Sequence, residues 1–414
     1  MKIVPRRALP LVVEALGDTR VVVLVGARQV GKSTLAAEIV RSGFPAELVN
    51  LDDRATREAV LADPAGFVAE LDEPSFIDEV QRGGADLMLE IKAAVDRDRR
   101  PGRFLLTGSA NLLAVRRAFE ALTGRAEVIT LWPFAQCELE QTSVNFVDSL
   151  FQNDPPRIAG APKGRRAFAE RVASGGYPEA LGRSARRRDA WFESYLNATL
   201  GRDLRELSDA HKLGELPRLL RLVASQSANL FVVKSLADRL GLDPRTVGDY
   251  CDLLEAAYMI RRIPGWRPGI GSREIQTPKA YVVDSGLLCH LLGADLRRLE
   301  RDDQVTGKAL ESFAAMEIIR HAEWAEIDAR AFHYRSGRRE IDVVLEDRSG
   351  GLACVEVKTA ASFAARDWRA MEALRDERSR QFRSGFLLYA GERTLPLGDR
   401  LWAVPVSALW DPGI

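Results

Sequence analysis

Cysteine is scarce in this sequence. The 414 residues contain only four cysteines, with no CxxC pair and no histidine at zinc-ligand spacing. This pattern argues against a disulfide framework and against a structural zinc site, and it suits a reducing compartment. The four residues are Cys137, Cys251, Cys289 and Cys354.

Long apolar runs and an excess of either charge are absent as well. No stretch approaches the ~20 apolar residues that cross a bilayer, and residues 1–16 lack the apolar core of a signal peptide. Lysine plus arginine and aspartate plus glutamate both number 59, so the net charge is zero and no global field draws the chain towards nucleic acid. We expect a soluble, cytoplasmic protein without membrane contact, in which any DNA contact comes from a local patch.

Short apolar runs alternate with helical patterns in the first third of the chain. Each run is typical of a strand that is buried on both faces, as in a parallel sheet. Periodic segments such as 86–95 lie between the runs and predict helices. We therefore expect an α/β domain over residues 1–142. The apolar runs lie at 21–25, 75–77, 104–106 and 128–131.

The rest of the chain divides into three further parts. Residues 143–228 begin with a segment rich in Asn, Asp, Pro and Gly at 145–164, which we expect to be a linker or a surface excursion. The remainder of that part is predicted to be a helical lid. Residues 229–268 form a compact unit, and residues 269–414 contain a connector and a second α/β domain with strands around a helix.

The compact unit has a helix–turn–helix–strand pattern. Asp243 and Pro244 are a favourable cap and first residue for its second helix. Two helices joined by a short turn that contains glycine, followed by a strand, are the outline of a winged helix-turn-helix. We therefore interpret residues 229–268 as a winged helix.

A phosphate-binding motif occupies residues 26–33, where GARQVGKS matches the pattern GxxxxGK[ST] in full. The motif follows a predicted buried strand and precedes a predicted helix, so the backbone can wrap around phosphates at a helix N-terminus. Lys32 would reach the β- and γ-phosphates of ATP, and Ser33 would supply a hydroxyl to Mg²⁺. We expect contacts with ATP from Gly26, Arg28, Gln29, Val30, Gly31, Lys32, Ser33 and Thr34.

Two carboxylates follow the next predicted strand of the domain. We expect Asp78 to hold Mg²⁺ and Glu79 to polarise the attacking water, as in a Walker B motif. The strand at 104–106 runs into the polar segment 107–111. There we expect Ser109 to sense the γ-phosphate, with a simple turn and helix cap as the alternative.

Arg125 immediately precedes the run at 128–131. An arginine at this position, just before a strand, could act as an arginine finger on the ATP of a neighbouring subunit and stabilise charge in the transition state. A surface ion pair is the alternative, because the chain is rich in arginine.

With these motifs in place, the sequence resembles the large bacterial and archaeal family of predicted ATPases that carry an AAA-type N-terminal domain and a C-terminal DUF4143 region. The resemblance implies an AAA+-like P-loop NTPase core, a winged helix and a C-terminal α/β domain similar to restriction endonucleases. The family usually has Thr after the P-loop lysine, and Ser33 is chemically equivalent. The stretches that carry the resemblance are GARQVGKSTL at 26–35, FIDEVQR at 76–82, FLLTGSANLL at 104–113, LTGRAEVITLWPF at 122–134, GGYPEAL at 175–181, TLGRDLREL at 199–207, PKAYVVDSGLL at 278–288, EIDVVLE at 340–346 and VEVKTA at 355–360.

Asp342, Glu356 and Lys358 look like the D…ExK core of metal-dependent nucleases of the PD-(D/E)XK type. Glu356 and Lys358 are two residues apart on a predicted strand and so share a face, and a hairpin would bring Asp342 beside them. The resemblance implies that Asp342 and Glu356 bind Mg²⁺ and that Lys358 steadies the water or the phosphate charge. Glu311 resembles the additional helical carboxylate of that family. The alternative is a solvated strand pair with a Glu–Lys ion pair, and whether the domain cuts DNA stays open.

Nucleic-acid contacts are expected from the winged helix. Arg245 and Thr246 begin its second helix, and Arg261 and Arg262 lie on the strand that follows. These side chains suit phosphates or base edges. The alternative is an ordinary solvated face or a protein-interaction module, because acidic residues balance the basic ones.

Three functions are consistent with these motifs. The preferred one is a Mg²⁺-dependent ATPase of AAA+ type that acts on DNA as a homo-oligomer, with a hexamer as one candidate, and whose nuclease-like domain engages branched or ended DNA in repair or recombination. The second is a slow ATP-binding switch that regulates a partner or promoter, with the nuclease-like domain inactive. The third is a metal-dependent nuclease that ATP gates.

Overall fold

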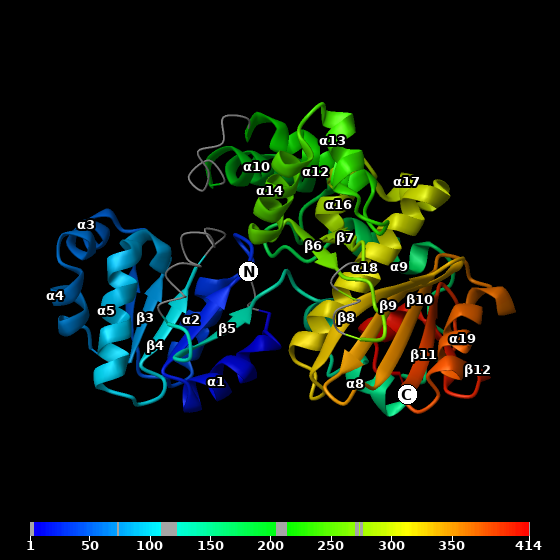
Figure 1. Ribbon diagram of the computed structural model, residues 1–414, viewed down its shortest axis with the longest axis horizontal. Coiled ribbons are helices and arrows are strands. Elements are labelled where there is room, and N and C mark those ends of the chain that lie inside the picture. The colour runs from blue at the N-terminus through cyan, green and yellow to red at the C-terminus, as the bar shows by residue number, and fades with distance from the viewer. Residues whose placement is uncertain are drawn as a thin grey trace.

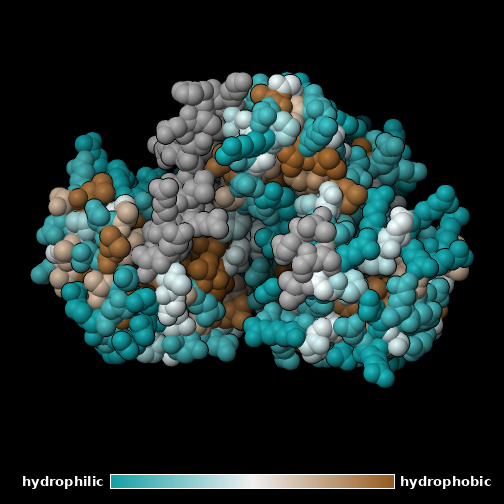
Figure 2. Space-filling model, viewed as in Figure 1, coloured by the Kyte–Doolittle hydropathy of each residue, from teal (hydrophilic) through white to brown (hydrophobic). Residues whose placement is uncertain are grey.

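The computed structural model describes residues 4–72, 74–108, 122–203, 213–269, 273 and 276–413. Figure 1 shows an N-terminal lobe around one sheet, a C-terminal lobe around a second sheet, and a helical region beside both. Most of the face in Figure 2 is hydrophilic, with separate hydrophobic patches on each lobe. No helix among the described residues is long and apolar enough to cross a membrane.

The N-terminal sheet has five parallel strands in the order β2-β3-β4-β1-β5. This arrangement confirms the predicted parallel sheet, and its interior strand β1 (Val21–Val25) is buried along its whole length. The other strands are β2 (Glu47–Asn50), β3 (Ser75–Asp78), β4 (Phe104–Thr107) and β5 (Ala126–Thr130). The helices of this lobe are α1 (Ala8–Asp18), α2 (Lys32–Arg41), α3 (Arg54–Ala62), α4 (Pro64–Glu70) and α5 (Gly84–Arg97).

Strand β5 differs from the expectation of burial on both faces. Val128 is 51% exposed, and only Ile129 of this strand is buried. Strand β5 is largely exposed because, among the described strands, it pairs with β1 and lies at the edge of the sheet. A run of apolar residues does not distinguish an edge strand from a central one.

The segment 145–164 is predicted to be a linker or a surface excursion, but its first part is buried. Its helix α8 (Phe146–Gln152) buries Phe146, Val147 and Leu150 against the C-terminal sheet, chiefly against β11 (Phe382–Tyr389). The polar residues of the segment serve as caps: Asn145 accepts a hydrogen bond from the backbone N–H of Asp148 and so starts the helix. Two further helices pack in this core, α7 (Gln136–Glu140) and α9 (Arg166–Ser174).

The segment predicted to be a winged helix contains helices followed by a two-stranded antiparallel sheet. Asp243 accepts hydrogen bonds from the backbone N–H groups of Arg245 and Thr246, as its capping role predicts. The second strand of the wing lies beyond residue 268, where we expected the unit to end. The elements are α10 (Ala185–Ala198), α12 (Leu216–Ser225), α13 (Val233–Leu240), α14 (Pro244–Ala256), β6 (Ile260–Ile263) and β7 (Lys279–Val282).

The C-terminal sheet has six strands in the order β12-β13-β11-β10-β9-β8 and is covered on both faces. Residues of β9 alternate: Val343 packs in the core that contains helix α18, and Val344 packs in the core that contains helix α19. The remaining elements are α16 (Ser285–Leu292), α17 (Leu296–Arg301), α18 (Asp303–Glu323), α19 (Arg369–Glu377), β8 (Ala329–Ser336), β9 (Arg339–Asp347), β10 (Leu352–Lys358), β12 (Leu395–Gly398) and β13 (Leu401–Pro405).

His321, near the end of α18, makes the stability of this core sensitive to acid. Its Nδ1 accepts a hydrogen bond from the backbone N–H of Phe146 at 3.1 Å, and burial lowers its pKa from 6.5 to about 3. The unfolded chain therefore binds a proton below pH ~6.5 that the folded chain does not bind until pH ~3, so stability falls as the pH drops through this window.

We expect the His321→Asn variant to lose stability less steeply between pH 6.5 and 4, because asparagine keeps an acceptor and does not titrate. The slope attributable to one histidine is at most ~1.4 kcal/mol per pH unit. Urea unfolding at a series of pH values measures it, with His290→Asn as the control because the His290 ring is only partly buried. An unchanged slope in His321→Asn would contradict the assignment.

Candidate functional site

The phosphate-binding loop joins β1 to α2, as the sequence predicts. Gly26 has a φ of 146°, and a Cβ atom there would lie 2.1 Å from the carbonyl oxygen of Leu131. Gly31 has a φ of 98° and precedes the first residue of α2. Both glycines are thus required by backbone geometry, and the loop ends with the free N–H groups of a helix N-terminus.

Lys32 is buried at the start of α2. Its Nζ donates hydrogen bonds to the carbonyl oxygens of Gly26 at 3.1 Å and Ala27 at 2.9 Å. Burial lowers the pKa of Lys32 to about 8, against the opposing charges of Glu79 and Asp78. The ammonium is therefore held within the loop by carbonyl oxygens, at the place where it could bind phosphate oxygens instead.

Two predicted Mg²⁺ ligands lie together beside this lysine. Ser33 Oγ donates to Asp78 Oδ1 at 2.9 Å. Thr107, at the end of the neighbouring strand β4, also donates to Asp78 Oδ1, and its Oγ1 accepts the backbone N–H of Glu79 at 3.1 Å. Hydroxyl and carboxylate oxygens are ligands that Mg²⁺ prefers, so the donor set fits this metal. Sequence reasoning placed Thr107 only as a neighbour of Ser109, which lies outside the described residues.

Glu79 has a left-handed backbone with a φ of 55° and a ψ of 45°. Non-glycine residues rarely adopt this conformation, and they do so most often at functional sites. Gln81 Nε2 donates a hydrogen bond to Glu79 Oε2 and so helps to orient the carboxylate. Sequence reasoning missed Gln81, although it lies two residues after the predicted base.

A cavity of about 590 Å³ adjoins the loop and is large enough for a small-molecule ligand. Of the eight residues predicted to contact ATP, all but Gly26 and Arg28 line it. Glu79 lines it as well. The lining also includes residues that sequence reasoning did not connect with the site: Val4, Arg6, Phe134, Pro178, Glu179 and Trp191.

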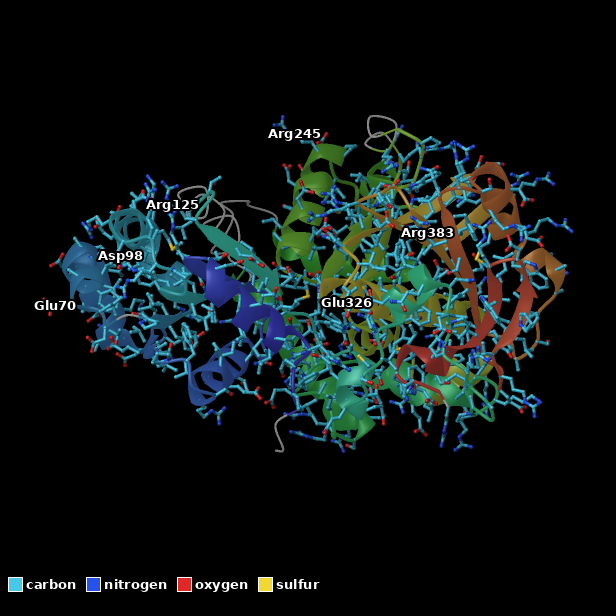
Figure 3. The ribbon with its side chains drawn as sticks, turned by 90° about the horizontal axis from the view of Figure 1, so that it is seen from below. Glu70, Asp98, Arg125, Arg245, Glu326 and Arg383 are labelled. Carbon is cyan, nitrogen blue, oxygen red and sulfur yellow. The ribbon has the colours of Figure 1, made fainter. Side chains whose placement is uncertain are left out.

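Arg125 lies at the other end of the sheet. Its carbonyl accepts the N–H of Val21, the first residue of β1, whereas the phosphate loop follows the last residue of β1. Its guanidinium forms a two-bond ion pair with Asp96, with Nε–Oδ1 at 2.5 Å and Nη2–Oδ2 at 2.9 Å. Figure 3 shows Arg125 on the N-terminal lobe. The structure therefore contains the ion pair that the sequence offered as the alternative, and an arginine finger on a neighbouring subunit stays a prediction.

A buried chain of polar contacts connects the phosphate loop with the C-terminal lobe. Arg6 donates to the carbonyl oxygen of Val30 and forms an ion pair with Glu138 at 3.2 Å, and both side chains are almost fully buried. Two residues before Glu138, the N–H of Gln136 donates to Glu317 of α18 at 2.8 Å. Arg320 in turn pairs with Glu317 at 2.5 Å and donates to the carbonyl oxygen of Val283 at 2.7 Å. We call these four charged residues, Arg6, Glu138, Glu317 and Arg320, the buried relay.

The carboxylates of the predicted nuclease-like centre are close together, but a lysine lies among them. Lys279 Nζ is 2.7 Å from Glu311 and 3.2 Å from Asp342. Lys358 pairs with Glu356 at 3.0 Å. Burial raises the pKa of Glu356 to about 8. No group of three or more His, Cys, Asp or Glu side chains in the described part of the chain could hold a metal ion.

The four predicted nucleic-acid contacts differ in their surroundings. Arg245 is exposed at the first turn of α14, and Figure 3 shows it extending away from the body of the protein. Thr246 beside it is partly buried. Arg261 is exposed and lies 3.9 Å from Glu255, whereas Arg262 is held by Glu255 at 2.5 Å and Asp252 at 2.6 Å. Arg245 and Arg261 are thus the exposed residues of the four, and Arg261 has an acidic neighbour.

Family models match three parts of the chain. They are described as an AAA domain at residues 18–140, a domain of unknown function (DUF8612) at 165–298 and a domain of unknown function (DUF4143) at 306–409. The uncharacterized protein Rv2008c of Mycobacterium tuberculosis and the uncharacterized protein Mb2031c of Mycobacterium bovis are each 32% identical to the chain over 409 residues. The matches cover 96% of this chain and 83% of each relative.

Solved structures with partial similarity include a Walker-type ATPase of Pyrococcus abyssi. It is 15% identical with a TM-score of 0.39, and the match covers 70% of this chain and 96% of that one. The RuvB Holliday junction branch migration motor of Thermotoga maritima is 18% identical with a TM-score of 0.30, and the match covers 62% of this chain and 88% of that one. These scores are too low to support an argument, so the assignment depends on the sequence matches. The chain belongs to the family of AAA-type P-loop ATPases that carry a C-terminal DUF4143 region.

Proposed function

We propose that the protein is a Mg²⁺-dependent ATP hydrolase that acts on DNA. The observation that carries the proposal is that Lys32, Ser33 and Glu79 line one cavity beside the phosphate loop, with Asp78 hydrogen-bonded to Ser33. Lys32 and the N–H groups at the start of α2 bind the phosphates. Ser33 and Asp78 would hold Mg²⁺, which would offset the negative charge of the phosphates.

Glu79 acts on the attacking water in this proposal. A carboxylate within hydrogen-bond reach of a water can accept its proton as the bond to phosphorus forms. Gln81 and the contact between Thr107 and the Glu79 backbone position that carboxylate, and both lie outside the phosphate loop itself. These two residues are positioning residues rather than catalytic ones.

The lining of the cavity supports coupling between ATP and the rest of the chain. Pro178, Glu179 and Trp191 belong to the helical region, so a nucleotide in the cavity would contact this region as well as the phosphate loop. Loss of the γ-phosphate would change the contacts across this interface and would move the winged helix relative to the N-terminal sheet.

DNA is the proposed partner because of the exposed first turn of α14. Arg245 is exposed there at the helix start, where its guanidinium can contact phosphates, and Thr246 lies beside it. A homo-oligomer, with a hexamer as one candidate, and a role in repair or recombination remain predictions; analytical ultracentrifugation with and without ATP tests the first.

The decisive experiment measures ATP hydrolysis with duplex, single-stranded and branched DNA. We expect DNA to raise the rate, and we expect Arg245→Ala to reduce that stimulation without changing the rate in the absence of DNA. Arg54→Ala is the control, because Arg54 is exposed in the N-terminal lobe and pairs only with its helix neighbour Glu58 among described residues. A rate that does not respond to any DNA would reject the DNA part of the proposal.

A slow nucleotide switch is the second candidate. The ion pairs of Arg262 with Glu255 and Asp252 favour it, because they withdraw one of the expected basic contacts from DNA. A switch would turn over ATP slowly at a rate that DNA does not affect, and its partner would bind only one nucleotide state. The same hydrolysis measurement therefore separates the two candidates.

A further inference from the structure

Lys279 is a fully buried lysine at the first position of strand β7. Its side chain is 1% exposed, and its Nζ lies 2.7 Å from Glu311 Oε1, 2.8 Å from Glu340 Oε1 and 3.2 Å from Asp342 Oδ1. An ammonium group has three N–H donors and no acceptor. Lys279 thus donates hydrogen bonds to Glu311 and Asp342 and forms an ion pair with Glu340 as well.

The partners of Lys279 come from a different part of the chain. Glu311 is on α18, and Glu340 and Asp342 are on β9. Lys279 itself is in the antiparallel β6–β7 hairpin of the winged helix. Tyr281, two residues further along β7, is also buried and donates its hydroxyl to Glu311 at 3.4 Å. The cluster thus joins the winged helix to the C-terminal sheet.

A divalent cation does not fit among these groups. Mg²⁺ requires oxygen atoms at about 2.0–2.1 Å in octahedral geometry, and the space between Glu311 and Asp342 is taken by an ammonium that would repel it. The second oxygen of Asp342 accepts the N–H of Val357 at 3.0 Å, and Glu356 Oε1 accepts from Lys358. Glu356 Oε2 has no partner among the described residues, but one oxygen is not a metal site.

We propose that the ammonium of Lys279 is the permanent counter-ion of this carboxylate cluster in place of a divalent metal, and that the cluster fastens the β6–β7 hairpin to the C-terminal sheet. The nuclease-like arrangement is then a structural joint that takes no Mg²⁺ and does not cut DNA. Burying a lysine costs free energy unless it is paired, and so does burying carboxylates. The Lys279 ammonium and the carboxylates of the cluster therefore stabilise each other.

The first test uses the wild-type, nucleotide-free protein and Mn²⁺ as the probe, followed by electron paramagnetic resonance. We expect no Mn²⁺ to bind at this cluster, so the titration of Asp342→Asn should match that of the wild type. A bound Mn²⁺ that disappears in Asp342→Asn would overturn the proposal. This comparison requires neither ATP hydrolysis nor DNA, so it is independent of the function proposed above.

The second test removes the counter-ion. We expect Lys279→Met to lower Tm by on the order of 10 °C, because it leaves buried carboxylates unpaired. Adding Glu311→Gln and Asp342→Asn to Lys279→Met should recover part of this loss. Lys308→Met on α18 is the matched control, because Lys308 Nζ donates to one carbonyl oxygen, that of Ser225, and should shift Tm far less.

Mn²⁺ should also raise the Tm of Lys279→Met, because the freed carboxylates can then take a metal, and it should leave the Tm of the wild type unchanged. A Lys279→Met variant as stable as the wild type would show that Lys279 does not balance the cluster. If that variant does not fold, the Mn²⁺ titration of the wild type decides the question alone.

Discussion

The Glu79→Gln variant is expected to bind ATP normally and to hydrolyse it about 10²–10⁴-fold more slowly. Glutamine keeps the size of the side chain and can still pair with Gln81, but it cannot accept a proton from water. Lys32, Ser33 and Asp78 are unchanged, so nucleotide affinity should remain. Single-turnover hydrolysis measures the loss, and fluorescent-nucleotide titration measures the affinity.

Glu58→Gln provides the control for this variant. Glu58 is exposed and pairs with Arg54 on α3, away from the cavity, so the same chemical change there should leave the rate intact. A Glu79→Gln protein that hydrolyses ATP at the wild-type rate would show that another group accepts the proton. Loss of nucleotide binding in Glu79→Gln would instead indicate a structural role for the carboxylate.

The Arg6→Met variant is expected to be destabilised by about 3–5 kcal/mol, the cost of leaving one partner of a buried ion pair without the other. Methionine keeps much of the side-chain volume next to Phe134, whose ring the guanidinium covers at 3.7 Å. The carboxylate of Glu138 would retain the N–H groups of Arg7 and Ala135 but lose its counter-charge. Urea unfolding followed by circular dichroism measures the difference.

A double variant separates charge from packing. Glu138→Gln added to Arg6→Met removes the unpaired charge. The double variant should therefore lose less free energy of unfolding than the sum of the losses in the two single variants. Arg7→Met is the neighbouring control, because Arg7 contributes its backbone N–H to Glu138 and its side chain contacts the carbonyl oxygen of Thr142. Strictly additive effects would contradict a direct interaction between Arg6 and Glu138.

The phosphate site could be predicted from sequence because its parts are local. The residues from Gly26 to Ser33 are contiguous, and the strand, loop and helix that hold them are short neighbouring segments. Asp78 could be added because the carboxyl ends of parallel strands meet at one edge of the sheet. Thr107 and Gln81 also lie at or just after the carboxyl ends of strands. Their hydrogen bonds, however, depend on side-chain positions that a motif does not specify.

Other features depend on contacts between distant segments, and sequence patterns were poor guides to them. Arg125 precedes its strand and so lies at the opposite edge of the sheet from the phosphates. The polar segment at 145–164 contains a buried helix because its caps satisfy the backbone and its aromatic residues face the sheet. Lys279 meets carboxylates 32 and 63 residues further along the chain, and no local pattern marks such a pairing.

The buried relay also bears on how the chain can be divided. Arg6 and Glu138 lie near the two ends of the N-terminal lobe in sequence, and the next contacts pass through the N–H of Gln136 to Glu317 and Arg320. A fragment that ends near residue 142 would lose Glu317, which accepts the Gln136 N–H, and Glu323, which accepts a hydrogen bond from Trp132. It would also expose Phe134 beside the phosphate loop. The lobes are therefore better regarded as one cooperative folding unit than as separable modules, and truncation would compromise the ATP site itself.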